Sequence, residues 1–167
     1  MDNVPQKVEL RTLAVGAGDA IAHARSQALL QGVRLSALCG NVWPLRDDGL
    51  GQLVADEIIA ELVAFAINAR RYLELVDQKT LKADGPILKI DLPDYRYEAN
   101  IWTAVNRIVH ASELRVVSVE RAQQTAPKHD NLGDLQVACV QVTSPQRDTV
   151  AVCPQGLFYG FAAFRAQ

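Results

Sequence analysis

The sequence has few cysteines, and their spacing excludes the metal sites that short cysteine motifs build. Cys39, Cys139 and Cys153 lie far apart, and no CxxC pair occurs. A self-contained four-ligand zinc ribbon therefore cannot form, and we expect no metal and no cofactor. An odd number of cysteines without an export signal indicates reduced thiols that are mostly buried. The sequence leaves open whether Cys39 and Cys153 have a metal or redox role.

Long apolar runs and a strong charge of one sign are also lacking. The most apolar window, residues 58–67, contains Glu61 and is soon followed by two arginines, so it is too short to cross a membrane. Residues 1–9 do not show the basic and then apolar pattern of a secretory signal, and we expect a cytoplasmic protein without a membrane partner. The net charge of −2 provides no general attraction to nucleic acid, although a local basic cluster would suffice for RNA.

What is present is the composition of an ordinary globular protein. The 167 residues are 49% hydrophobic and 22% charged, which is enough for one well-formed core. We predict a single α+β domain over residues 1–167. It comprises an N-terminal helix and short hairpin in residues 1–50, a helical core in residues 51–112, and a C-terminal antiparallel β-meander in residues 113–167.

The N-terminal part contains helix signals followed by an alternating stretch. Asp19 is placed to cap a helix that runs to about Gln31, with Gly32 as its stop. The period-two pattern of Val33–Cys39 predicts a strand. Val42–Leu45 contains a proline and is typical of an edge strand or a covering loop.

Residues Ala28 to Pro44 resemble the opening of a small actinobacterial zinc-ribbon family of unknown function. In that family a Cys-Pro-x-Cys pair closely follows the Cys-Gly knuckle, whereas no cysteine occurs here between Cys39 and Cys139. The resemblance implies hairpin geometry for this segment and a structural remnant without the metal.

The strongest predicted helix runs from Gly51 to Val76. Apolar residues occupy most of its circumference, which is typical of a helix at the centre of a bundle. Its polar strip consists of Asn68, Arg70, Arg71 and Glu74. Arg70 and Glu74 are four residues apart, so we expect them to pair with each other.

A second helix is predicted over Glu98–Ser112, with two distinct faces. The apolar face consists of Ile101, Ala104, Val105, Ile108 and Val109, and the polar face of Thr103, Asn106, Arg107 and His110. Asn106 and His110 lie one turn apart on the same side, with Arg107 beside them. An amide, a guanidinium and an imidazole together can bind or cleave a phosphorylated group, and the alternative is a solvated helix face.

After this helix the apolar period changes from helical to two. Strands are predicted over residues 114–120, 135–142 and 149–153. Residues 154–156 are predicted to turn, and the apolar tail, residues 157–164, is predicted to be a strand or a short docking helix.

The run Asn106–Ala111, N-R-I-V-H-A, is similar to the N-K-I-I-H-A-type signature of bacterial proteins related to HEPN domains. Phe65–Glu74 resembles the F-x-x-N-A-R-x-x-L-E helix of the same group, and the likeness covers residues 53–167. HEPN domains are small helical domains, often dimeric, of toxin–antitoxin, phage-defence and RNA-processing systems. The resemblance implies a HEPN-like accessory protein that binds RNA or a partner protein, and it is compatible with a homodimer.

The resemblance also assigns candidate site residues. Ribonuclease-active HEPN domains carry an arginine four to six residues before the histidine, but only two residues separate Arg107 from His110 here. This departure leaves catalysis open; an enzyme of this kind would be a metal-independent endoribonuclease. His110 would transfer the proton, Arg107 would clamp the phosphate and Asn106 would orient it. The binding residues expected on the facing helix are Asn68, Arg70 and Arg71.

Two other functions fit the sequence. One is a non-catalytic structural or inhibitory protein–protein interaction module, with an apolar edge strand and Trp43 or Tyr95 as anchors. The other is a small-molecule binding domain whose pocket lies between the helices and the sheet.

Overall fold

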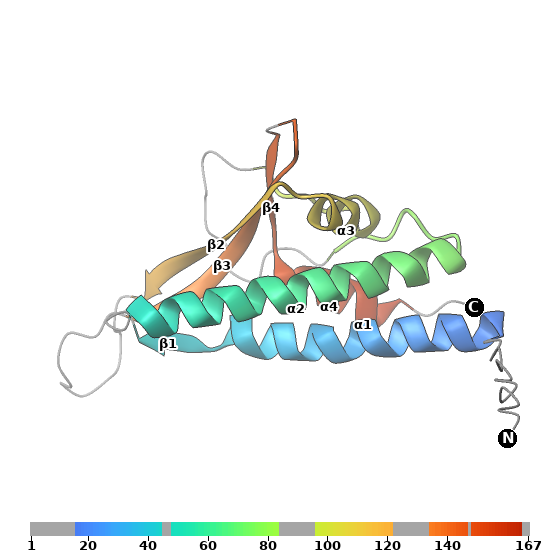
Figure 1. Cartoon of the computed structure of the whole chain (residues 1–167), viewed down its shortest axis with the longest axis horizontal. Coiled ribbons are helices and arrows are strands. Elements are labelled where there is room, and N and C mark those ends of the chain that lie inside the picture. Colours follow the sequence, from blue (N-terminus) through green and yellow to red (C-terminus); the bar gives the residue numbers. More distant parts are fainter. Residues whose placement is uncertain (1–15, 45–47, 84–95, 122–133, 147, 165–167) are drawn as a thin grey trace, which may run out of the picture.

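The computed structural model describes residues 16–44, 48–83, 96–121, 134–146 and 148–164. The predicted α+β fold, with a helical core followed by antiparallel strands, is confirmed (Figure 1). In chain order the elements are α1 (Ala17–Gly40), β1 (Val42–Pro44), α2 (Asp48–Leu75), α3 (Ile101–Val109), β2 (Glu113–Arg121), β3 (Asp134–Thr143), β4 (Thr149–Val152) and α4 (Pro154–Ala163).

Two long helices, α1 and α2, lie side by side and form the base of the molecule (Figure 1). Contacts between Arg34 and Glu61 and between Gln31 and Asn68 show that the two helices run antiparallel. The shorter α3 and the sheet lie across α2, and α4 packs against α1. The predicted central position of the α2 helix is therefore confirmed.

The aromatic centre of the core lies between α2 and α4. The ring of Phe161 on α4 makes edge-to-face contacts with Phe65 and Tyr72 of α2, at centroid separations of 5.6 and 5.5 Å. All three side chains are almost completely buried. Such pairs contribute about 0.5–1.5 kcal/mol each beyond the burial of their surface, so the aromatic centre fixes α4 against α2.

The sheet is built around β3. The strand β2 pairs along one edge of β3, while β1 and β4 pair with opposite ends of the other edge, all antiparallel. The sequence β2–β3–β4 is the meander that the period-two pattern predicts. A short segment, Arg96–Glu98, extends the sheet because Tyr97 forms a parallel bridge to Ala151 of β4.

The strand predicted at Val33–Cys39 is wrong, and so is the hairpin that the zinc-ribbon likeness implies. These residues continue α1 without a break, and β1 pairs with β3. Gly32, the predicted stop, lies in the interior of α1. The Phe158 ring of α4 packs directly over its backbone. A Cβ atom on Gly32 would lie 2.2 Å from Phe158 Cδ2. The missing side chain serves helix packing and does not end the helix.

The turn predicted at residues 154–156 is also wrong, because α4 begins there. Pro154 occupies the first helical turn, where its missing N–H is not required, and Cys153 is the N-cap. The apolar tail is therefore the docking helix of the two alternatives. Helix α3 begins at Ile101, three residues later than predicted. Tyr95 lies outside the described residues.

No helix in the described parts of the chain is both long and apolar enough to span a membrane.

Substituting the two glycines Gly32 and Gly51 tests the helix packing. Gly32→Ala should lower the free energy of unfolding by about 2 kcal/mol, because the Phe158 ring must move aside. Gly51→Ala in α2 is the matched control, since a Cβ there would meet no atom within 4 Å. It should raise stability by about 0.5–1 kcal/mol through helix propensity. Chemical denaturation measures both, and a neutral or stabilising Gly32→Ala would contradict the packing argument.

Candidate functional site

Helix α3 is held at its start by Asn100. The Oδ1 atom of Asn100 accepts a hydrogen bond from the backbone N–H of Thr103 at 2.8 Å, as an N-cap does, and its Nδ2 donates to the carbonyl of Lys79 at 3.0 Å. The residues of α3 that are buried against the core are Ile101, Ala104, Val105 and Ile108. The predicted apolar face of this helix is confirmed, and its polar face is turned outward.

The polar face of α3 and the β3–β4 turn enclose an open groove of about 780 Å³, which we call the α3 groove. It is lined by Trp102, Thr103, Asn106, Arg107, His110, Ser144, Pro145, Gln146 and Asp148. The three residues predicted as a catalytic group, Asn106, Arg107 and His110, therefore share one cavity. Its volume lies within the range of small-molecule and nucleotide sites.

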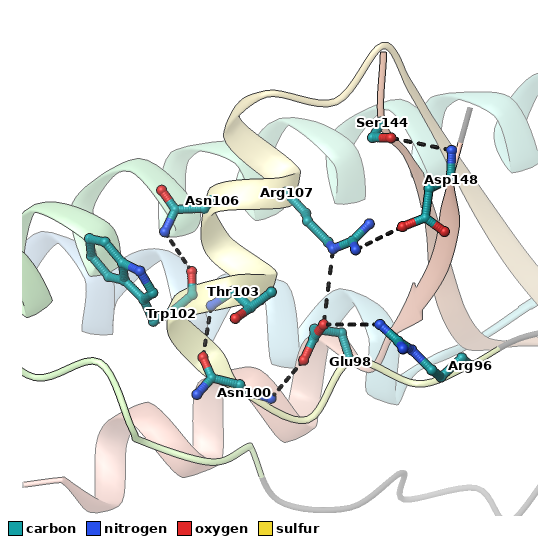
Figure 2. A network of polar contacts seen from close by, with 9 residues as sticks. All are labelled: Arg96, Glu98, Asn100, Trp102, Thr103, Asn106, Arg107, Ser144 and Asp148. Atoms are coloured by element: carbon teal, nitrogen blue, oxygen red, sulfur yellow. Dashed lines mark hydrogen bonds and ion pairs between the residues drawn. The ribbon is translucent and has the colours of Figure 1, made fainter. Parts of the chain in front are cut away.

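Arg107 is held by two carboxylates (Figure 2). Its Nη2 lies 2.8 Å from Asp148 Oδ2 on the β3–β4 turn, and its Nε lies 4.0 Å from Glu98 Oε2. Glu98 Oε1 also accepts from the Asn100 backbone N–H at 3.1 Å. These contacts join the segment before α3, the helix itself and the turn. The guanidinium of Arg107 therefore links the elements that form this wall of the groove. A phosphate would have to compete with Asp148 for the guanidinium.

Asn106 and Trp102 lie on a different side of α3 from the Arg107 contacts (Figure 2). The Asn106 Nδ2 donates to the Trp102 carbonyl one turn earlier at 2.8 Å. Its Oδ1 points away from the helix backbone in Figure 2. The amide carbonyl is therefore the part of Asn106 that a ligand in the groove can meet.

His110 is exposed at the C-terminal end of α3, where it contacts Arg70 of α2. The distance from Arg70 Nη1 to His110 Nε2 is 3.1 Å, and Arg70 Nε also lies 3.2 Å from Glu74 Oε1, as predicted from their spacing. Because a guanidinium can only donate, Nε2 must accept, which places the imidazole proton on Nδ1. The fold thus brings one predicted binding residue directly to the predicted catalytic histidine.

The other two predicted binding residues do not join the groove. Asn68 lies between α1 and α2, where its Nδ2 donates to the Ala64 carbonyl at 3.1 Å. Arg71 is exposed and is turned by about 100° around α2 from Arg70. The polar residues of α2 therefore lie in three different places: Arg70 beside His110, Asn68 between the long helices and Arg71 on the exposed surface.

The sequence reasoning missed the aromatic part of the groove. Trp102 is half-buried, and Lys79 Nζ lies 5.7 Å from the centre of its ring, a cation–π contact. The signal was available, because Trp102 precedes Asn106 by four residues and His110 by eight, which places all three on one row of the helix. The β3–β4 turn, by contrast, is far away in sequence and has no motif.

The described ranges contain no cluster of three or more histidine, cysteine or acidic side chains that could hold a metal ion. Comparison with protein-family models, curated proteins and solved structures finds no match to this chain. The assignment of function therefore depends on the geometry of the groove and on the sequence resemblance.

The Arg107 contacts predict a loss of stability when the guanidinium is removed. Arg107→Met keeps the aliphatic stem but leaves Glu98, whose side chain is only 13% exposed, with Arg96, a more exposed arginine whose Nη2 lies 4.0 Å from Glu98 Oε2. We expect the free energy of unfolding to fall by about 1–2 kcal/mol. Arg115→Met is the control, because Arg115 makes an exposed pair with Glu113 and should contribute less than about 0.5 kcal/mol. Equal losses in denaturant titrations of the two variants would contradict a bridging role.

Proposed function

We propose that this protein is a HEPN-like RNA-binding accessory protein of a bacterial or phage defence or toxin–antitoxin system, and that single-stranded RNA binds in the α3 groove. The sequence resemblance supports the kind of system. The groove is the argument for RNA as the ligand. The deciding observation is the row of Trp102, Asn106 and His110 in the groove. A cation lies at each end of this row, Lys79 beside Trp102 and Arg70 beside His110.

Each part of this row matches a contact that unpaired RNA makes. A half-buried indole offers a face on which a base can stack, and such stacking contributes about 1–3 kcal/mol per base. The Asn106 carbonyl can accept hydrogen bonds from a base edge. Lys79 and Arg70 can meet phosphates, because the carboxylates that pair with them, Asp77 and Glu74, are exposed and hold them weakly. The row from residue 102 to residue 110 is about 12 Å long at 1.5 Å per residue. An overall charge of −2 does not oppose this, because the cations are local.

The arrangement favours binding over cleavage. Cleavage of RNA needs a group that takes a proton and a second cationic group that is free to hold the phosphate. Here the Nε2 of His110 already accepts from Arg70, and Arg107 is held by Asp148 and Glu98. We therefore assign binding to the groove and do not assign catalysis.

Binding can be measured with a labelled single-stranded RNA of mixed sequence by fluorescence anisotropy. Trp102→Ala should weaken binding about tenfold or more through the lost stacking. Arg70→Ala should weaken binding and reduce the salt dependence by about one unit of slope, as one lost phosphate contact does.

The matched control for Arg70→Ala is Arg71→Ala, which removes the same charge from the next position of α2, whereas Arg70 is the arginine that contacts His110 of the groove. Arg71→Ala should leave affinity and salt slope nearly unchanged. A duplex RNA should bind more weakly, because its bases are already stacked. Equal effects of the two arginine variants would contradict RNA binding in the α3 groove. Binding without salt dependence would contradict the proposed phosphate contacts.

A second assay separates binding from catalysis. The parent protein and His110→Ala, incubated with the same RNA in the presence of a chelator, should both leave the strand intact on a denaturing gel. Cleavage by the parent that His110→Ala abolishes would overturn the non-catalytic assignment and establish a metal-independent ribonuclease. Cleavage by both proteins would indicate a contaminant.

A protein-binding module is the second candidate, and the long helices favour it. Leu30 and Val33 of α1 and Ile67 of α2 are large apolar side chains that are about half exposed. Trp43, the predicted anchor, is instead half-buried, and its Nε1 donates to the Leu38 carbonyl at 3.1 Å. A docking partner would therefore use the helices and not Trp43. This candidate gains weight if RNA binding does not respond to the groove variants.

A further inference from the structure

The described cysteines are all reduced and buried, and two of them lie in or directly after neighbouring strands. Cys139 lies in β3, and Cys153 directly follows β4. The register of β3 and β4 pairs Val140 with Val152 and Gln141 with Ala151. Extending this antiparallel register by one position places Cys139 opposite Cys153. The Cys153 backbone is still extended there, with φ −93° and ψ 108°.

The hydrogen bonding of Ala151 determines what kind of pair this is. Ala151 uses both its N–H and its C=O on the Arg96–Glu98 segment, on the side away from β3. The pair Gln141–Ala151 is therefore not hydrogen-bonded across the ladder. Because the two kinds of pair alternate, Val140–Val152 is hydrogen-bonded and Cys139–Cys153 is not. Side chains of such pairs lie on the same face, with Cα atoms about 4.5 Å apart, within the range of disulfides.

The electrostatics of the thiols agree with this closeness. Burial raises the pKa of Cys139 to about 11, and the neighbouring Cys153 contributes to the increase. Burial also raises the pKa of Tyr97, with further contributions from Cys139 and Cys153. The buried Tyr97 hydroxyl lies near the Cys139 sulfur, and hydrogen bonding from it partly opposes the rise in the pKa of that thiol.

Cys153 is the thiol best placed to react first. It is 8% exposed, whereas Cys39 and Cys139 are at most 1% exposed. Its Sγ accepts the backbone N–H of Gly156 at 3.4 Å, because Cys153 is the N-cap of the ten-residue helix α4.

We propose that Cys139 and Cys153 form an oxidation site, a cross-strand dithiol that a peroxide converts to a disulfide. The Cys153 thiol gives up its proton as its sulfur attacks one peroxide oxygen. The O–O bond breaks, and the departing oxygen takes that proton and leaves as water. The resulting sulfenic acid is attacked by the Cys139 sulfur. The S–S bond forms, and the hydroxyl group leaves with the Cys139 proton as a second water. Two thiols are oxidised and one peroxide is reduced.

Cys39 is the competing partner. Its pKa is raised to about 12 by burial, with a contribution from Cys153, so it also lies near that residue. Cys39 belongs to α1, however, and its side chain packs into the main core cluster, to which neither of the other two cysteines belongs. The strand register therefore favours Cys139, and the experiment separates the two pairings.

Peptide mapping of the intact chain tests this directly, because trypsin releases each cysteine on its own peptide. Residues 35–46 carry Cys39, residues 129–147 carry Cys139, and residues 148–165 carry Cys153. The reduced protein is treated with hydrogen peroxide, denatured with N-ethylmaleimide present, and digested without reductant. We expect peptides 129–147 and 148–165 to be joined, two hydrogens lighter than their sum, and peptide 35–46 to carry the alkylating group.

Three alkylated peptides, or a link between peptides 35–46 and 148–165, would overturn the proposal, as would stepwise over-oxidation of Cys153 without a link. Cys139→Ser should abolish the link and leave Cys153 as a sulfenic acid that dimedone traps. Cys39→Ala is the matched control and should retain the link. The mapping of the unmodified chain remains decisive if either variant folds poorly.

Discussion

The contact on which the remaining structure depends is the packing of α4 against the paired long helices. Phe158 lies over the bare backbone of Gly32, and Phe161 fits between two aromatic rings of α2. Because α4 follows β4 with only Cys153 between them, the position of α4 also fixes β4 and the turn before it. That turn carries Asp148, which binds Arg107 and so positions α3. A contact between α1 and α4 is in this way transmitted to the groove.

The sequence predicts an element correctly where its own apolar pattern determines the secondary structure. It fails where a contact with a distant part of the chain determines the secondary structure. The apolar circumference of α2, the two-faced pattern of α3 and the strand patterns of β2, β3 and β4 each identify the correct type of element, with α3 shorter than predicted. Residues 33–39 fit two periods, since Leu35 and Cys39 also continue the helical face of Ala28. The helix prevails because Gly32, the apparent stop, is required there by a ring 126 residues later in the chain.

The site could be predicted to the extent that it lies on one helix. The four-residue spacing places Asn106 and His110 on one side of α3, and the structure agrees. Which groups surround them was beyond the sequence, because Arg70 and Asp148 come from other elements. One position along α2 separates Arg70, which reaches His110, from Arg71, which does not, and only the angle between two packed helices determines that difference.

The groove and the dithiol lie at opposite ends of the same short strand. Asp148 precedes β4 and Cys153 follows it, and five residues of extended chain place them about 17 Å apart. Strand β4 is held by β3 on one side and by Arg96–Glu98 on the other. The proposed disulfide would therefore be attached to the same strand whose other end leads to Asp148, the carboxylate that binds Arg107 of α3.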